Sequence, residues 1–314
     1  MQDIIPPVDP QLIKAELNSK RFLRKTNKAG NELYVITAKN SPNVMREVGR
    51  LREITFRAAG GGTGLDCDID HYDTAEKGFK QLILWDPEDE QIIAGYRYLN
   101  CWELDFERGE EKFLATAHLL KFSPTFINEY LPNTIELGRS FVQPNYQADK
   151  SKKGIFSLDN LWDGLAVLFE ASPKAKYFFG KVTMYPSYNS EARDHLLAFM
   201  HHYFPQRGQL ITPYQPLVSQ TDTTAFVEQL KSQPYKEGLK LLTNFIREKG
   251  ERIPPLISSY MSISETMMTF GTALNDEFGG VEETGILVTI DDIFPEKKNR
   301  HLEGYVKNPE LDWA

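Results

Sequence analysis

The sequence TIELGRSFVQPNYQ at residues 134–147 most constrains what this chain can fold into. Residues 135–142 are expected to form a short buried strand, and Pro144 ends it because proline cannot donate to a strand ladder. Glu136 and Arg139 both fall inside that strand. Charged side chains in such a place are costly unless they are paired or used by a site. We therefore expect functional chemistry on this strand.

A basic loop and a helix follow the strand. The loop DKSKKG leads into a helix with an apolar stripe that begins near Ser157. Strand, basic loop and helix together present backbone N–H groups and a helix N-terminus to a phosphate-bearing ligand. A solvated surface loop is an equally good interpretation of the same pattern. The candidate contacts are Lys150, Lys152, Lys153 and Gly154.

Composition narrows the class of function. The chain has 314 residues and a net charge of −8, which argues against nucleic-acid binding. Two cysteines are too few for a disulfide framework and fit a reducing compartment. The sequence shows no signal peptide and no run of about 18 apolar residues. We expect a cytoplasmic protein, with a peripheral position on the inner membrane face as the alternative.

The hydrophobic patterns predict an α+β fold. Ser41 and Pro42 mark a helix start, and a polar turn joins two strands into a hairpin. The order of elements indicates a mixed, mostly antiparallel sheet flanked by helices. Expected strands are 32–37, 79–86, 91–98, 134–142, 177–185 and 284–290; expected helices are 11–17, 42–58, 116–120, 126–130, 157 onward, 189–203, 223–231 and 235–249.

The second part of the chain is expected to extend the first. We expect a core at 1–205 and a mainly helical extension with a final strand at 206–314. The Met-rich segment 256–274 is interpreted as a core helix, with transient membrane contact as the alternative. The polar tail after Pro295 is expected to be mobile.

An acidic cluster lies in the sequence DCDIDHYD. Its spacing D-x-D-x-x-D suits a divalent-metal loop, but the glycine and the distant glutamate of a calcium loop are absent, so we predict no metal site. A solvated acidic turn is the simplest interpretation. The alternatives are that the carboxylates pair with arginines around a cleft, or that they hold an amine substrate. The residues concerned are Asp68, Asp70 and Asp73, with Arg57, Arg97 and Arg139.

Motifs in a characteristic order carry a resemblance to a known family. They are the helix with Arg57, then DIDHYD, GYRYL and ELGRS, continued by LWDGLA, FFGKVTMYP, IPPLISSYMSIS and TGILVTIDDI. The chain resembles acyl-carrier-protein-dependent N-acyltransferases of the GNAT superfamily. Within them it is most similar to the ornithine–acyl-ACP N-acyltransferases, often labelled hemolysin-like, and more distantly to the acyl-homoserine-lactone synthases. The resemblance covers residues 45–200 well and 253–292 moderately.

The resemblance implies a GNAT fold, no permanently bound cofactor, and roles for single residues. The phosphopantetheine arm of the donor would lie between splayed strands at 135–142 and 177–185. The donor would be acyl-ACP, because the basic loop lacks the Q/R-x-x-G-x-G/A sequence that wraps the pyrophosphate of acyl-CoA. The catalytic residues would be Glu136, Arg139, Asp70, Asp73 and Arg97, and the residues that contact the amine substrate would be Arg57 and Asp68. The residues that contact the acyl donor would be Phe141, Val142, Lys150, Lys152, Lys153 and Gly154. The three lysines would also contact the acidic carrier protein.

The implied reaction is direct attack of an α-amine on a thioester carbonyl. No G-x-S-x-G motif and no evident Cys–His pairing point to a covalent intermediate. Glu136, if buried, would have a raised pKa and act as base, while a backbone N–H near Phe141 or Val142 would stabilise the oxyanion. A purely structural pair of Glu136 with Arg139 is an equally open interpretation.

The expected product is a lyso-aminolipid formed from a long-chain acyl group, with or without a 3-hydroxyl, and an amino acid such as ornithine. The sequence does not fix the amino acid. None of the six histidines has an aspartate five positions on, so the H-x-x-x-x-D sequence of lysophospholipid acyltransferases is absent. Alternatives are an acyl-CoA-dependent acetyltransferase and a non-catalytic module that binds acyl-ACP or lipid.

Overall fold

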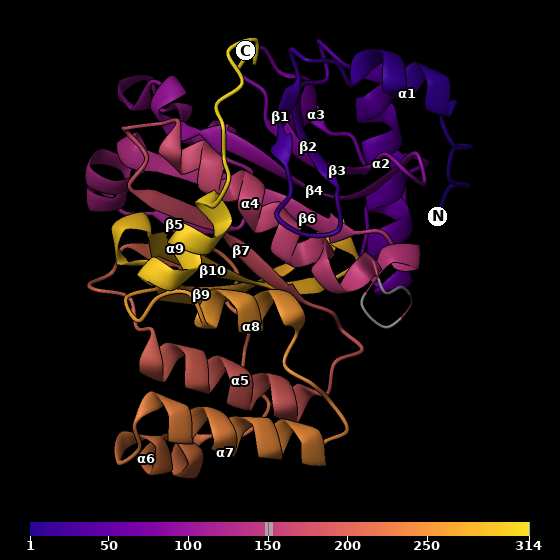
Figure 1. Ribbon diagram of the computed structural model, residues 1–314. Coiled ribbons are helices and arrows are strands. Elements are labelled where there is room, and N and C mark those ends of the chain that lie inside the picture. The colour runs from indigo at the N-terminus through magenta and orange to yellow at the C-terminus, as the bar shows by residue number, and fades with distance from the viewer. Residues whose placement is uncertain (148–149, 151–152, 314) are drawn as a thin grey trace.

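The computed structural model describes residues 1–147, 150 and 153–313. Its centre is one large, mostly antiparallel sheet (Figure 1). In spatial order its eight strands are β1 (Phe22–Lys25), β2 (Glu32–Ile36), β3 (Lys80–Asp86), β4 (Gln91–Asn100), β6 (Thr134–Val142), β7 (Tyr177–Met184), β10 (Val281–Thr289) and β9 (Met268–Asn275). β6 and β7 pair in parallel, and the other neighbours pair antiparallel. The predicted α+β class with a mixed sheet is confirmed.

Helices pack on this sheet, and a small second sheet lies beside it. Its two strands are β5 (Leu120–Phe122) and β8 (Ile211–Pro213). The helices are α1 (Pro10–Glu16), α2 (Pro42–Ala58), α3 (His71–Thr74), α4 (Ser157–Glu170), α5 (Ser190–Tyr203), α6 (Thr224–Lys231), α7 (Tyr235–Glu248), α8 (Pro255–Met261) and α9 (Pro295–Leu302). Short 3₁₀ and π turns fill most of the segment 101–133.

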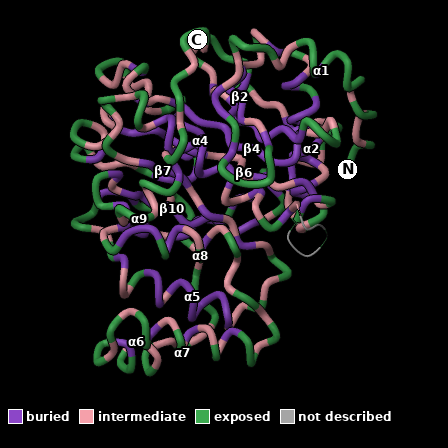
Figure 2. The backbone as a smooth tube through the Cα atoms, in the orientation of Figure 1, coloured by how far each residue is buried: buried purple, intermediate pink, exposed green. Residues whose placement is uncertain are grey.

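Alternation along the strands divides the core between the two faces of the sheet. Leu82 and Leu84 of β3 belong to the apolar cluster that includes α4, α5 and α8. Ile83 and Trp85, between and after them, belong to the cluster beneath α2. Figure 2 shows burial concentrated in the sheet and in α2 and α4, whereas α6 and the chain ends are largely exposed.

β6 and β7 part halfway along their length. The parallel ladder joins Thr134–Leu137 of β6 to Tyr177–Gly180 of β7 and ends there. Beyond it, β6 continues beside β4 as far as Val142, and β7 continues beside β10 as far as Met184. The facing edges of the two strands are therefore no longer paired to each other. This confirms the predicted splay, where an extended ligand can pair with strand backbone.

Two predictions of local structure are wrong. The segment 256–274 forms the short helix α8 and then the strand β9, instead of one core helix. Pairing with β10 decides this, because strand preference depends on neighbouring strands more than on local pattern. Residues 116–120 form turns that lead into β5, not a helix. In the described part of the chain, no helix combines the length and apolar character that a membrane span requires.

The C-terminal end of the chain is more ordered than predicted, and the N-terminal part is bound to it. The tail after Pro295 forms α9, and His301 on it lies 2.7 Å from Asp163 of α4. Near the N-terminus, Arg24 of β1 is buried. Its guanidinium donates to the backbone carbonyls of His301 and Glu303 at 2.6 and 2.9 Å. Contacts between distant segments, not local sequence, order both ends.

Gly180 generates a prediction about the parting strands. A Cβ there would lie 2.5 Å from the carbonyl oxygen of Leu137, its ladder partner. Gly180→Ala is therefore expected to push β6 and β7 apart and to lower the free energy of unfolding by about 1–3 kcal/mol. Chemical denaturation followed by circular dichroism measures this. Gly138→Ala is the matched control, because a Cβ there comes no closer than 3.5 Å to any neighbouring atom. Equal stability of the two variants would contradict the close approach.

Candidate active site

Arginines and aspartates form one ion-pair network on the α2 side of the sheet. Arg97 of β4 donates to Asp70 at 2.8 Å and lies 3.5 Å from Asp73. Arg139 of β6 pairs with Asp68 at 3.0 Å and approaches Asp70 at 3.7 Å. The acidic cluster thus pairs with arginines and is not a solvated turn. In the described residues no group of three or more His, Cys, Asp or Glu side chains suits a metal ion.

Arg52, and not Arg57, completes this network. Arg52 donates to Asp73 at 3.0 Å and to the amide oxygen of Gln81, and the Gln81 amide donates back to Asp73 at 2.9 Å. Arg57 pairs instead with Glu53 at 2.7 Å. The prediction that Arg57 joins the aspartates is wrong, because five helical residues turn the side chain by about 140°. We call Arg52, Arg97, Arg139, Asp68, Asp70 and Asp73 the arginine–aspartate network.

A β-bulge directs Arg139 into the network. The register between β4 and β6 shifts over residues 138–141. Arg139 has a φ of 48°, which is uncommon for a residue other than glycine. Bulges bend a strand and re-aim a side chain. The guanidinium consequently lies 4.1 Å from the ring centroid of Phe278 and beside Asp68.

Burial and charge act against each other on these carboxyls. Burial alone would raise the pKa of Asp73, but Arg52 and Arg97 outweigh it and hold that pKa at about 2. For Asp68 burial prevails over Arg139 and Arg52, and its pKa is raised. Burial opposes the charge of Arg97, yet Asp73 and Asp70 raise its pKa further. The network therefore keeps its arginines charged in a water-poor place.

Glu136 stands apart from the network and is fully buried. Its carboxylate accepts hydrogen bonds from the N–H groups of Ala115 and Thr116 at 3.1 and 2.9 Å. The Thr116 hydroxyl also donates to it, at 2.8 Å. Burial raises the pKa of Glu136 to about 7 against the effect of these bonds and of Arg97. The interpretation of a Glu136–Arg139 pair is wrong, because the bulge turns Arg139 to the aspartates.

A second buried ion pair spans β7 and β10. Lys181 of β7 pairs with Glu283 of β10. Thr183 and Asn275 also donate to Glu283, at 3.2 and 2.8 Å. Neither Lys181 nor Glu283 is among the predicted site residues. The available signal is a lysine and a glutamate inside otherwise apolar strands, in FFGKVTM and VEETGILVT.

The basic loop is tied to the neighbouring hairpin. Lys153 lies 2.9 Å from a carboxylate oxygen of each of Asp86, Glu88 and Asp89 on the turn between β3 and β4. Gly154 is buried, and a Cβ there would lie 2.3 Å from a backbone oxygen of Tyr146. Both residues therefore shape the loop itself.

The other predicted donor contacts are Lys150, Lys152, Phe141 and Val142. Lys150 is exposed, whereas Lys152 lies outside the described residues. Phe141 packs into the cluster beneath α2, and Val142 is partly buried at the end of the strand. A donor-binding role for these residues stays a prediction.

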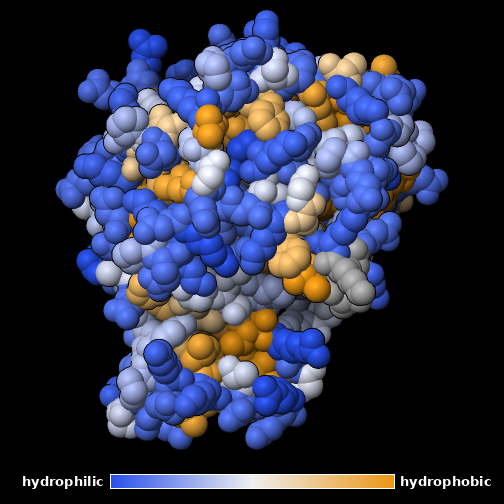
Figure 3. Space-filling model, in the orientation of Figure 1, coloured by the Kyte–Doolittle hydropathy of each residue, from blue (hydrophilic) through white to orange (hydrophobic). Residues whose placement is uncertain are grey.

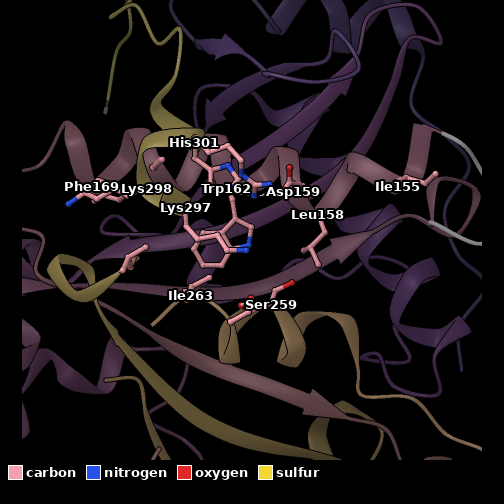
Figure 4. A pocket seen from close by; sticks show the side chains of 14 residues that line it. Ile155, Leu158, Asp159, Trp162, Phe169, Ser259, Ile263, Lys297, Lys298 and His301 are labelled. Atoms are coloured by element: carbon pink, nitrogen blue, oxygen red, sulfur yellow. Dashed lines mark hydrogen bonds and ion pairs between the residues drawn. The ribbon is translucent and has the colours of Figure 1, made fainter. Parts of the chain in front are cut away.

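Hollows occur on both sides of the sheet. A groove of about 220 Å³ runs along α4 between α8 and α9, with the Trp162 indole at its middle (Figure 4). Its lining is apolar at Phe169 and Ile263, and its rim carries Lys297, Lys298, Arg300 and His301. Figure 3, which has the orientation of Figure 1, shows apolar side chains gathered in a hollow between α8 and α5. A second pocket, of about 230 Å³, is lined by residues that include His118, Tyr214, Asn275 and Glu277.

Comparison with known proteins defines the class. Residues 51–157 match the acetyltransferase (GNAT) domain family. The chain is 53% identical over 309 residues to a glycine N(alpha)-acyltransferase of Bacteroides thetaiotaomicron, covering 98% of this chain and 92% of that protein. It is 51% identical over 308 residues to a glycine N(alpha)-acyltransferase of Phocaeicola vulgatus, covering 98% and 94%. The chain belongs to this family of GNAT-type N-acyltransferases. The predicted fold and the prediction of an acyltransferase enzyme are confirmed.

Two solved structures resemble the chain more weakly. One is a CoA-dependent acyl-homoserine lactone synthase, MesI, at 13% identity and a TM-score of 0.35, covering 90% of this chain and all of that one. The other is the CoA-dependent acyl-homoserine lactone synthase BjaI with SAM and isopentyl-CoA, at 11% identity and a TM-score of 0.37, covering 87% and 89%. At these values the likeness does not bear on the site.

Removing one carboxylate tests the network. Asp73→Asn leaves Arg52 and Arg97 short of a buried counter-charge, so we expect a loss of about 3–5 kcal/mol of unfolding free energy at pH 7. The folded pKa of about 2 lies below the ordinary value, so this stabilisation is present at neutral pH. It is lost as the pH falls below about 4, and the difference between variant and parent should shrink there.

Chemical denaturation at several pH values measures this effect. Glu228→Gln is the control, because its pair with Lys231 is exposed and should change stability by less than about 1 kcal/mol. An Asp73→Asn protein as stable as its parent at pH 7 would show that the network does not depend on this charge.

Proposed function

We propose that the enzyme transfers a long-chain acyl group from an acyl-carrier-protein thioester to the α-amine of glycine. The observation that carries the proposal is Glu136, a buried carboxyl with a pKa of about 7 on β6, next to the point where β6 and β7 part. A carboxyl titrating near neutral pH is suited to accept the proton that an attacking amine loses. The strand edges that part beside it suit an extended pantetheine arm.

The donor side of the proposal rests on shape and charge. The groove along α4, on the face of the sheet opposite Glu136, has an apolar lining that suits a long acyl chain. The positive charges of Lys297, Lys298 and Arg300 on its rim suit an acidic carrier protein, which we propose as the partner. Acyl-CoA is the alternative donor. An N-acyl amino acid is amphiphilic, so the apolar hollow of Figure 3 also suits brief contact with a membrane when the product leaves.

The acceptor side rests on the carboxylates. Ornithine has a cationic side chain, which would need a carboxylate of its own. Asp68, Asp70 and Asp73 are each already paired with an arginine of the network. Glycine has no charged side chain and needs no such carboxylate. Both relatives are named glycine N(alpha)-acyltransferases. We therefore propose glycine in preference to ornithine.

The proposed step is a direct aminolysis. The amine nitrogen attacks the thioester carbonyl carbon, so that a C–N bond forms and the C–S bond breaks. Because Glu136 is fully buried, we place one water molecule between it and the amine, and the carboxylate takes the proton that the nitrogen releases. The thiolate of the carrier leaves and is protonated. The arginine–aspartate network keeps the surroundings polar and ordered.

Product analysis tests the reaction. The purified protein is incubated with 3-hydroxypalmitoyl-ACP or 3-hydroxypalmitoyl-CoA and an equimolar pool of amino acids, and products are identified by mass spectrometry. N-acylglycine as the main product with the ACP donor is the expected result. A main product from ornithine would overturn the acceptor, and turnover with the CoA donor alone would overturn the carrier protein. No product from either donor would favour a binding module.

Glu136 gives a prediction about pH. The carboxylate form is the active base, so kcat/KM should rise with pH through about 7. Glu136→Gln should remove this rise and lower kcat by roughly 100-fold or more, while the melting temperature falls by only a few degrees. Thr116→Val is the matched variant: it removes a hydrogen bond that lowers the pKa of Glu136, so the rise should move to higher pH. Equal losses of turnover and melting temperature in Glu136→Gln would assign the carboxyl to the fold.

A further inference from the structure

Lys181 lies on the same face of the sheet as Glu136. In the parallel ladder Glu136 is opposite Phe179, and Lys181 is two residues beyond Phe179 on β7. Side chains two positions apart on a strand share a face. Strand geometry places the Cα atoms of Glu136 and Lys181 about 8 Å apart. Lys181 is thus the first charged residue of β7 past the end of the ladder, on the side of the proposed base.

The ammonium of Lys181 has hydrogen-bonding capacity to spare. A lysine carries three N–H donors, and of the residues that the structure describes only Glu283 accepts one. The side chain is 11% exposed, and burial lowers its pKa. Buried polar groups normally have at least one partner, and for Lys181 this is Glu283, which leaves two N–H donors for another acceptor. A desolvated cation with open donors at the edge of a site therefore indicates a ligand.

Gly138, which would be opposite Lys181 if the ladder continued, leaves room on this face of β6. Gly138 follows Leu137, the last β6 residue of the ladder, and a Cβ at Gly138 would come within 4 Å of Arg97 side-chain atoms alone. One of these is Nε of Arg97, 3.5 Å away. That N–H is buried and has no hydrogen-bond partner in the described part of the chain. A second unfilled donor therefore faces the space at Gly138.

We propose that Lys181, together with Nε of Arg97, binds the carboxylate of the acceptor amino acid and so brings its α-amine to Glu136. An α-amino acid has a suitable form, because one carbon separates its amine and carboxylate. A hydrogen bond of about 2.8 Å to Lys181 at one end, and the water molecule placed next to Glu136 at the other, cover the remaining distance. This inference rests on the proposed function, since it assigns how that function's acceptor is recognised.

Glu283 acts in this scheme as a positioning residue. It holds the Lys181 ammonium and is itself fixed by Thr183 and Asn275 at 3.2 and 2.8 Å. Burial opposes the charge of Glu283, but Lys181 and Asn275 outweigh it and lower its pKa. A fixed carboxylate keeps the lysine charged and directed, which a long flexible side chain does not achieve by itself.

A purely structural ion pair is the competing explanation, and the chain contains a matched example. Arg193 of α5 pairs with Glu282 of β10 and, at 2.9 Å, with Asp194. Glu282 is adjacent to Glu283 on the strand and therefore lies on the opposite face. The two pairs have similar chemistry and burial, but only the Lys181 pair lies on the side of Glu136.

The experiment compares glycine with glycinamide, which keeps the amine and lacks the carboxylate. With the thioester that the enzyme uses, kcat/KM for glycine should exceed that for glycinamide by roughly 10- to 100-fold. Lys181→Met with Glu283→Gln should remove this preference by raising KM for glycine, with little change for glycinamide. The double substitution removes both charges, so no unpaired buried charge is left to unfold the protein. Lys181→Arg should keep part of the preference.

Arg193→Met with Glu282→Gln is the control and should leave the preference unchanged. A parent enzyme that acylates glycine and glycinamide equally well would overturn this inference and leave the proposed function standing. The inference would also be overturned if the Lys181→Met/Glu283→Gln protein kept the parental melting temperature but its kcat/KM fell equally for glycine and glycinamide. Absence of N-acylglycine from every thioester would overturn the proposed function itself, and this inference with it.

Discussion

Charge buried on one face of the sheet is the constraint on which the rest of this structure depends. Arg52, Arg97 and Arg139 lie where water is scarce, and each would be strongly destabilising without a counter-charge. The counter-charges do not come from the sheet. They come from Asp68 and Asp70 in the loop before α3 and from Asp73 in α3. In α3 the Asp70 side chain accepts from the Asp73 N–H, and the Asp73 side chain accepts from the Asp70 N–H. This reciprocal cap fixes the aspartates, so the loop and the sheet hold each other in place.

Strands on both sides of the seam between β6 and β7 supply side chains to the candidate site. β4 and β6 supply Arg97, Arg139 and Glu136, while β7 and β10 supply Lys181 and Glu283. Four ladder pairs hold the strands together at one end, and no pair joins them at the other. A ligand between the free edges would touch groups from both halves. In the proposed reaction the acceptor would contact both sides, with Lys181 on β7 and with Arg97 and Glu136 on β4 and β6, so that the two halves of the sheet together fix its orientation.

Much of the sheet was predictable because its strands and helices follow local pattern. β3, β4, β6 and β7 and the helix α2 lie close to their predicted bounds. The prediction that Arg57 pairs with the aspartates follows from the family motif. The apolar stripe of the helix favours Arg52 instead. Arg52 follows the buried Val48 by four residues, so helix periodicity places it on the buried face. That signal was available in the sequence.

The remaining differences depend on contacts between distant segments. β9 exists because β10 pairs with it, and Lys181 is paired with a residue 102 positions away. The bulge at Arg139 separates it from Glu136, although the spacing of the two residues suggested a pair. Local sequence carries no signal for such pairings, and three-dimensional packing alone decides them.

The position of β10 has a consequence for how the chain can be shortened. β7 pairs with β10 along its whole length, from Tyr177 to Met184. A protein that ended after residue 205 would therefore present β7 as an edge strand with an open row of N–H and C=O groups. Such edges pair with other molecules and promote aggregation. The outer edge of β9 is covered in turn, because Pro205 forms a β-bridge with Thr269 and Pro216 forms one with Ala273. The late strands thus act as edge protection, and a shortened catalytic half would be expected to precipitate.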